Sequence, residues 1–226
     1  MNVLKKLIFS ALIFAGSYSC FAQEISIRGG FNLSQFIYST DDLVVRKEGT
    51  TLKPGFNFGP IVNFPIDNNW SLETGILFIS KGLKLSGNIM GDKDYLRIKN
   101  LYYLELPVLI KATIPIKKAK ILAIAGIYAG NALYGFSLAE GTENSVSYRL
   151  KDKIQFGNEP NEYDRFDYGL KFGFGTKIKR YQIGALYSVG LKNFANDDIF
   201  LMRNRVLEFY LQYQLKKSNL RNPKTH

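Results

Sequence analysis

The residue types that most often carry catalysis are scarce in this sequence of 226 residues. Histidine, the usual base near neutral pH, occurs once, as His226. We expect a base at a chain end to be too mobile to stay within hydrogen-bond reach of a nucleophile. No serine lies in a GxSxG turn, the strand-to-helix turn that exposes a nucleophile. The sequence therefore predicts a protein that is not an enzyme and needs no cofactor.

Paired carboxylates are the remaining candidates for chemistry. Asp41–Asp42 and Asp197–Asp198 are adjacent acids in stretches that we expect to be loops. Neighbouring loop acids are usually solvated, and these lack the spaced oxygen ligands of an EF-hand loop, which leaves weak calcium binding as the alternative. We predict no metal site.

The N-terminal residues have the order of a signal peptide. Lys5 and Lys6 precede a short apolar run over 7–15, and the small residues Cys20 and Ala22 stand three places and one place before a cleavage point after Ala22. An alternative makes Cys20 a lipidated cysteine, but the usual leucine three places ahead of it is missing. We expect residues 1–22 to be a signal peptide. Because Cys20 is the only cysteine, we expect no disulfide in the mature chain.

Apolar and polar residues alternate through most of the remaining sequence. In 205–215, Leu207, Phe209 and Leu211 share one face while Glu208 and Gln212 lie on the other, which is the period of a half-buried strand. The same pattern predicts strands near 24–34, 53–66, 70–84, 98–115, 120–134, 166–178 and 181–191. About eight strands fit an all-β fold: a closed antiparallel up-and-down transmembrane β-barrel over 23–215, followed by a basic C-terminal tail, 216–226.

The connections between these strands are alternately short and long. The short ones are 65–69, 115–119 and the hairpin at Lys179–Arg180, and the long ones are 35–52, 85–97, 135–165 and 192–204. Outer-membrane barrels have short periplasmic turns and longer external loops. We therefore expect the short turns to face the periplasm.

Volume decides which face of the strands is outside. The interior of an eight-stranded barrel has little room, so bulky apolar side chains must face lipid and glycines and polar residues the lumen. Buried ions must then pair, for example Glu105 or Glu208 with Lys111 or Lys171. A packed polar core is one interpretation and a conducting path the other. The lumen polar network that we predict comprises Arg28, Glu73, Lys81, Glu105, Lys111, Asp167, Lys171 and Glu208.

Positive charge gathers at the predicted periplasmic end. Two interpretations fit this basic periplasmic rim: lysines that reach lipid phosphates, or a docking surface for an acidic periplasmic partner. The basic periplasmic rim comprises Lys117, Lys118, Lys120, Lys179, Arg180, Lys216 and Lys217. Aromatic residues that we expect at the membrane interfaces are Trp70, Tyr102, Tyr103, Tyr128, Tyr134 and Tyr181.

A net charge of +11 also raises the question of nucleic-acid binding. The charges alternate singly with apolar residues or lie in turns, and no RNA-binding, zinc or helix-turn-helix pattern is present. We predict no nucleic-acid partner.

Four segments resemble a known family. They are RGGFNLSQF at 28–36, WSLETGILFISKGLKL at 70–85, YYLELPVLIKATI at 102–114 and GIYAGNALYGF at 126–136. These segments are similar to the PorT-type outer-membrane β-barrel family of Bacteroidota, and YLELPVLIK is the most specific match. The resemblance implies an eight-stranded barrel and, for the namesake member, a part in type IX protein secretion across the outer membrane.

Three functions from different classes follow. The first is a structural or interaction barrel in the outer membrane, monomeric and surrounded by outer-membrane lipid, with a periplasmic or secretion-machinery protein as partner. The second is a small passive channel, which a filled eight-stranded lumen disfavours. The third, a soluble exported ligand-binding barrel, requires the two faces to be reversed.

Overall fold

The computed structural model describes residues 23–40, 43–45, 50–89, 92–143, 146–157, 159, 162–195 and 201–216. The expected signal peptide, both acidic pairs, His226 and the tail beyond Lys216 lie outside these described residues. Within them, no helix combines the length and apolar character needed to cross a membrane.

Strands make up almost all of the described chain. Their bounds are β1 (Glu24–Thr40), β2 (Leu43–Val45), β3 (Thr50–Thr51), β4 (Lys53–Pro65), β5 (Trp70–Gly75), β6 (Leu77–Ile89), β7 (Asp92–Ile116), β8 (Ala119–Glu143), β9 (Val146–Lys153), β10 (Phe166–Ile178), β11 (Tyr181–Gly190) and β12 (Leu201–Lys216).

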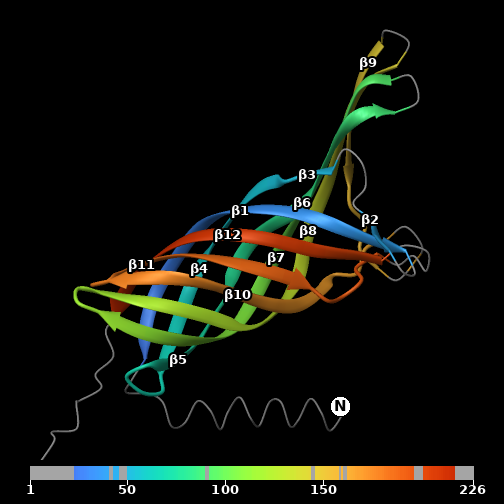
Figure 1. Ribbon diagram of the computed structural model, residues 1–226. Coiled ribbons are helices and arrows are strands. Elements are labelled where there is room, and N and C mark those ends of the chain that lie inside the picture. Colours follow the sequence, from blue (N-terminus) through green and yellow to red (C-terminus); the bar gives the residue numbers. More distant parts are fainter. Residues whose placement is uncertain are drawn as a thin grey trace, which may run out of the picture.

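These strands close into an antiparallel barrel with eight strand positions (Figure 1). We call each position a stave, because one of them is occupied by two consecutive strands. β5 and β6 form one stave, interrupted at Ile76, and the ring runs β1, β4, β5–β6, β7, β8, β10, β11, β12. It closes where β1 pairs with both β12 and β4. Hydrogen bonding around the ring satisfies the backbone without a free edge, which a lipid-facing sheet requires. The predicted fold class, an all-β antiparallel barrel with a ring of eight strands, is confirmed.

The short turns lie together at one end of the barrel. Two of them have only two residues, Lys117–Lys118 and Lys179–Arg180. Lys117 and Lys179 both take a positive φ, 40° and 53°, which glycine or asparagine adopts more readily than lysine. In the third turn, Asp67 Oδ1 accepts hydrogen bonds of 2.7 Å from the backbone nitrogens of Asn69 and Trp70.

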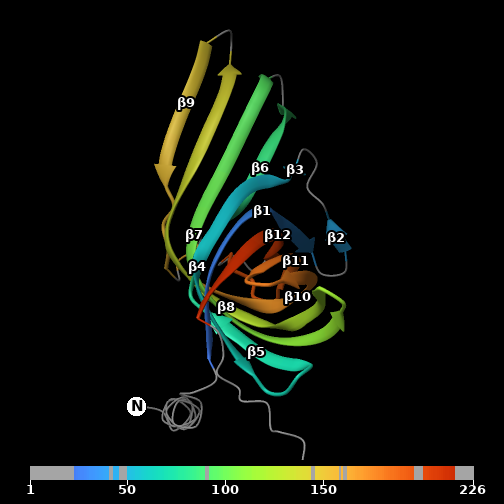
Figure 2. The ribbon, with the colours of Figure 1, turned by 90° about the vertical axis from the view of Figure 1, so that its left-hand side faces the viewer.

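At the opposite end, four strands continue beyond the barrel as a flat sheet. β7 and β8 each have 25 residues, and β6 and β9 pair on either side of them (Figures 1 and 2). Because about 9–11 residues suffice to cross a bilayer, more than half of β7 and β8 lies outside the hydrocarbon.

The expectation of loops at 85–97 and 135–165 is therefore wrong over much of their length. Residues 92–97 and 135–143 are strand, and β9 covers Val146–Lys153. The physical reason is that both faces of a strand outside the membrane are wet. Polar residues then stand on both faces, and the alternation that predicts a strand is lost.

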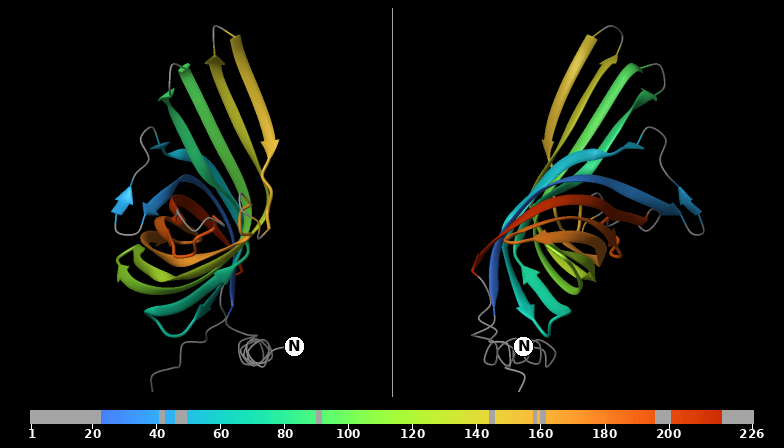
Figure 3. Two further views of the ribbon diagram at one scale, coloured as in Figure 1. Left: turned by 90° about the vertical axis from the view of Figure 1, so that its right-hand side faces the viewer. Right: turned by 60° about the vertical axis from the view of Figure 1, so that its left-hand side comes forward.

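A bulge marks the point where the extension leaves the barrel. Tyr102 pairs with Tyr134 and Tyr103 pairs with Ala132, which leaves Leu133 as an extra residue in β8. Bulges bend a strand and increase its local twist. The sheet leans away from the barrel axis beyond this point (Figure 3).

Candidate functional site

The eight charged residues expected in the lumen all lie inside the barrel. Each is at most 4% exposed. Four are cations and four are anions, so their formal charges sum to zero. They are Arg28, Lys81, Lys111, Lys171, Glu73, Glu105, Asp167 and Glu208.

Three of them form a group centred on Glu73 of β5. Arg28 Nη2 lies 2.5 Å from Glu73 Oε1, and Lys111 Nζ lies 2.8 Å from Glu73 Oε2. Arg28 also donates hydrogen bonds to Gln212 Oε1, and the bond from Nη2 is 2.6 Å long. Both oxygens of the buried carboxylate are thus used, which a buried ion requires. Lys111 pairs here with Glu73, whereas Glu105 or Glu208 was its expected partner.

The other five form a chain across the lumen. Lys81 Nζ lies 2.8 Å from Glu105 Oε2 and 2.9 Å from Asp167 Oδ2. Lys171 contacts the second oxygen of Glu105 and lies 2.6 Å from Glu208 Oε1. β6, β7, β10 and β12 supply these side chains, so the chain of ions ties non-neighbouring staves together. The ions of this chain are therefore paired with one another inside the barrel.

Tyr103 and Tyr128 line the lumen, so their expected place at a membrane interface is wrong. They are 0% and 2% exposed, and Lys81 Nζ lies 5.0 Å and 4.3 Å from their ring centroids. Tyr103 shares the inward parity of Glu105, two residues along the same strand. A desolvated ammonium is attracted to an aromatic face.

An apolar cluster closes the lumen at the end that bears the extension. Phe194, which follows β11, is 0% exposed and stacks edge-on against Phe36 of β1 at 4.7 Å between ring centroids. Ile154 and Tyr163, from the segment between β9 and β10, pack into the same cluster. This apolar cap was not anticipated, because the volume argument considered only the staves. We define the cap by Phe36, Ile79, Leu83, Leu101, Tyr103, Ala132, Ile154, Phe194, Met202 and Val206.

The outer wall carries an unbroken row of aromatic rings. Neighbouring rings in this row lie 4.5–6.3 Å apart between centroids. The row crosses β4, β6, β7 and β8 at the level where the extension begins, as an aromatic belt at a membrane interface does. Its members are Phe56, Phe58, Phe78, Tyr102, Tyr134 and Phe136. Trp70 and Tyr181 are exposed near the short-turn end, 49% and 55%.

The basic rim lies at the short-turn end, and part of it surrounds a hollow. This hollow has a volume of about 340 Å³. Lys120 and Lys177 are directly opposed in the β8–β10 ladder, where like charges repel. Lys177 Nζ lies 2.9 Å from Glu24 Oε2. Lys117, Lys118 and Lys179 also line the hollow, whereas Arg180 and Lys216 lie outside it. Lys217 is outside the described residues.

β9 is the outermost strand of the extension. Throughout the part of the chain that the structure describes, it pairs with β8 alone, so its other edge joins no described strand. Arg149 Nε lies 2.9 Å from Glu140 Oε1 on the adjacent strand. Leu150, in the middle of β9, is 56% exposed. The site therefore consists of a barrel with a paired-ion interior, an exposed sheet edge at one end and a basic rim at the other.

A family model matches most of the sequence. Residues 21–196 match the family model described as outer membrane protein beta-barrel domain. No curated protein matches the chain. Among solved structures, the chain is similar to the attachment invasion locus protein Ail of Yersinia pestis, with 13% identity over 86% of this chain and 99% of that one and a TM-score of 0.36.

The outer membrane protein OprG from Pseudomonas aeruginosa is also similar, with 10% identity, 86% and 97% of the two chains covered and a TM-score of 0.43. Neisserial surface protein A gives 10% identity, 84% and 97% coverage and a TM-score of 0.41. The family model covers more than half of the sequence and agrees with the closed barrel. This chain belongs to the outer membrane protein beta-barrel domain family.

Proposed function

We propose that this protein is an interaction barrel of the outer membrane, in which a sealed body holds a rigid external sheet that binds an extended segment of another protein. The observation that carries the proposal is the edge of β9 that pairs with no described strand. An exposed edge presents unpaired backbone N–H and C=O groups, to which a partner strand can add.

The dimensions of the extension support binding at this edge. β9 has eight residues, all exposed or half-buried, and it stands on β7 and β8, which run without interruption from the barrel. A strand of this length can pair with an extended peptide along its whole edge. Lys151 and Lys153 add positive charge, which favours a segment with acidic residues.

The sealed lumen argues against a passive channel. Paired ions fill its middle, and the apolar cap closes the external end. The faces argue against a soluble carrier, because large apolar side chains stand outward, as with Ile127 at 56% and Phe174 at 68% exposed. Planar-bilayer recordings of the purified barrel are expected to be silent, and stable conductance steps would contradict a sealed body.

Site-specific photo-crosslinking in living cells tests the edge. A photoreactive phenylalanine analogue at position 150 is expected to capture a protein in the external medium or at the cell surface. The matched control is the same analogue at Ile127, which is also 56% exposed but lies on the membrane face of β8. The proposal fails if position 150 captures no more protein than position 127.

Protein secretion is the specific role that we assign to this binding. The support is the resemblance to the PorT-type barrels of Bacteroidota, whose namesake takes part in type IX secretion. A deletion strain is expected to lose a subset of exported proteins from its medium, and wild-type protein is expected to restore them. If the set of exported proteins is unchanged, the role is architectural.

The hollow in the basic rim favours a second binding function, for an acidic periplasmic partner. Five lysines line it against the single carboxylate of Glu24. Reversal of charge at Lys117 and Lys118 is expected to remove a periplasmic protein from pull-downs of a correctly inserted barrel. An unchanged pull-down pattern would reject this docking.

A further inference from the structure

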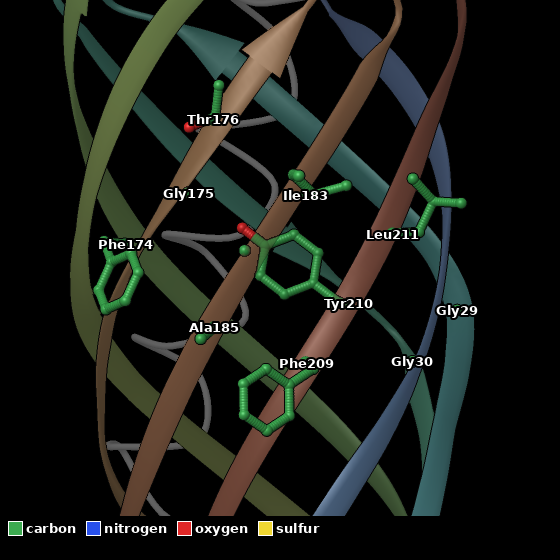
Figure 4. A pocket seen from close by; sticks show the side chains of 11 residues that line it. Gly29, Gly30, Phe174, Gly175, Thr176, Ile183, Ala185, Phe209, Tyr210 and Leu211 are labelled. Atoms are coloured by element: carbon green, nitrogen blue, oxygen red, sulfur yellow. The ribbon is translucent and has the colours of Figure 1, made fainter.

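A shallow apolar hollow lies on the outer wall across β10, β11, β12 and β1 (Figure 4). Its volume is about 600 Å³. Ala185 of β11 stands between Phe174 and Phe209, its register partners on the two adjacent strands. The two rings form the walls of a groove, and the small alanine side chain forms its floor.

The next step of the same ladders extends the groove toward β1. There the register partners are Thr176, Ile183, Leu211 and Gly29 in that order. A Cβ atom built on Gly29 would have no atom within 4 Å, so the wall is open at this point. Four adjacent staves thus provide a continuous apolar surface with a depression in it.

The groove lies near the short-turn end of the barrel. Tyr181 and Tyr213 are register partners one ladder step closer to that end, and their ring centroids are 5.1 Å apart. Ala185 lies five positions beyond Arg180 in the sequence, which is about 17 Å along a strand. On a strand tilted by about 45°, this corresponds to a depth of about 12 Å, within one leaflet of a hydrocarbon core about 30 Å thick.

Three cations stand where the groove meets the membrane surface. Lys179 and Arg180 form the β10–β11 turn, and Lys216 ends β12. The backbone nitrogen of Gln214 donates a hydrogen bond of 2.9 Å to the carbonyl oxygen of Arg180, which fixes the turn against β12. In the described ranges, none of the three cations has a carboxylate within ion-pair distance.

From this arrangement we infer that the wall formed by β10, β11, β12 and β1 is a binding site for one anionic glycerophospholipid of the periplasmic leaflet. An acyl chain lies over Ala185 between Phe174 and Phe209, and the phosphate is held by Lys179, Arg180 and Lys216. A lipid is the occupant because the hollow opens to hydrocarbon and its charged end lies at headgroup depth. The inference is independent of partner binding at β9, whereas Lys179 is shared with the rim hollow.

Native mass spectrometry of the full-length mature barrel tests the site. The protein is released from micelles that contain equal amounts of phosphatidylglycerol and phosphatidylethanolamine. Wild type is expected to retain one phosphatidylglycerol in preference to phosphatidylethanolamine. Ala185→Leu fills the floor of the groove and is expected to lower that retention about tenfold, whereas the double variant Lys179→Glu, Arg180→Glu is expected to abolish the preference for the anionic lipid.

Two matched controls accompany these variants. Ala125→Leu makes the same substitution on the outer face of β8, and Lys117→Glu with Lys118→Glu reverses charge at the other two-residue turn. Heat-modifiable gel mobility establishes that each variant is folded. Equal loss of lipid in Ala185→Leu and Ala125→Leu, no preference for phosphatidylglycerol in wild type, or a protein dimer in place of the lipid adduct would each overturn the inference.

A second measurement covers the case in which a variant does not fold. Trp70 is the only tryptophan, so Trp70→Phe combined with Phe209→Trp places a single fluorophore at the groove. Vesicles with brominated phosphatidylglycerol are expected to quench it more than vesicles with the same amount of brominated phosphatidylethanolamine. Equal quenching by the two lipids would contradict a site for an anionic lipid.

Discussion

Lys81 of β6 and Asp167 of β10 meet across the interior of the barrel, where Lys81 Nζ lies 2.9 Å from Asp167 Oδ2 and both side chains are fully buried. β7 and β8 separate these two staves in the sheet, so the ion pair links strands that share no backbone hydrogen bonds. The contact therefore fixes the cross-section of the barrel.

Removal of the Lys81 charge is expected to destabilise the barrel strongly. Lys81→Met leaves Asp167 and Glu105 as buried carboxylates with one cation fewer, and breaking a buried pair typically costs about 3–5 kcal/mol. Urea unfolding in lipid vesicles, followed by gel mobility, measures this loss. The addition of Asp167→Asn is expected to recover part of the loss because it removes one uncompensated charge. Similar stabilities for Lys81→Met and wild type would contradict a tightly paired interior.

The half-buried ion pair between Lys192 and Asp164 differs from the pairs in the lumen and gives the stability a pH dependence. Lys192 Nζ lies 2.8 Å from Asp164 Oδ2 in the connections at the end of the barrel that bears the extension. Partial burial of Asp164 opposes its ionisation, but the hydrogen bonds from Lys192 and from the backbone nitrogen of Phe166, together with the charge of Lys192, outweigh this and lower the pKa of the carboxyl below 3.8. The same hydrogen bond raises the pKa of Lys192 above 10.5.

The sign of each pKa shift fixes the pH range over which the pair stabilises the fold. The Asp164 contribution is present above the carboxyl's unfolded pKa and is lost as pH falls through the lowered value. The Lys192 contribution is present below the unfolded pKa of the amine and is lost as pH rises through the raised value. Lys192→Met is expected to cost at most about 1 kcal/mol at pH 7, since solvent screens the pair, and this cost is expected to shrink as pH falls through the lowered pKa of Asp164. Urea unfolding of both proteins across this range would refute the assignment if the difference grew with acidity.

The apolar cap is expected to depend on Phe194. Phe194→Ala removes a fully buried ring from contact with Phe36 and with Tyr163, and such truncations typically cost about 3–5 kcal/mol. The cost falls first on the segment 154–165, of which Ile154, Phe156 and Tyr163 pack into the cap. Limited proteolysis of whole cells is expected to cleave this segment faster than in wild type. Phe166→Ala, at a side chain 46% exposed on the outer face, serves as the control and is expected to leave the cleavage rate unchanged.

Substitution by alanine is expected to lower stability at Gly173 but to change it little at Gly29. A Cβ on Gly173 would lie 2.0 Å from the carbonyl oxygen of Ala185, so Gly173→Ala must push β10 and β11 apart. We expect a loss of at least about 1–3 kcal/mol or failure to form the barrel. Gly29→Ala meets open space and is expected to change the free energy of unfolding little. Refolding yields into detergent micelles measure both, and equal yields would contradict the close approach at Gly173.

Parity along the strands predicts much of the barrel from the sequence. The rule that puts Glu208 inside and Phe209 outside needs only the two-residue period and the limited volume of an eight-stranded lumen. The same rule places Tyr103 inside with Glu105. Tyr103 was wrongly predicted at the membrane interface because its aromatic type was given more weight than its parity. The partner of each ion was less predictable. Arg28 meets Glu73 because of the stagger between staves, which no single strand encodes.

The external features were predicted least. β9 carries charge on both faces because both are wet, so its sequence contains no alternation of apolar and polar residues. Ile154 and Phe194 enter the cap from connections whose path depends on the completed barrel. The sequence alone offered no signal for either feature beyond the presence of apolar residues in otherwise polar connections.

The two-residue turns combine an unfavourable backbone with a cationic side chain. Lys179 has a φ of 53°, and a left-handed conformation costs a non-glycine residue roughly 1–2 kcal/mol, less for asparagine. Lys179→Asn is therefore expected to raise the free energy of unfolding by about 1 kcal/mol and to slow unfolding in urea. Lys118→Asn is the matched control, because Lys118 is not among the residues with positive φ, and it is expected to give no gain. The Lys179→Asn variant can also be tested for its preference for phosphatidylglycerol. If it is more stable but has lost that preference, lysine is kept at this position for its charge at the cost of turn stability.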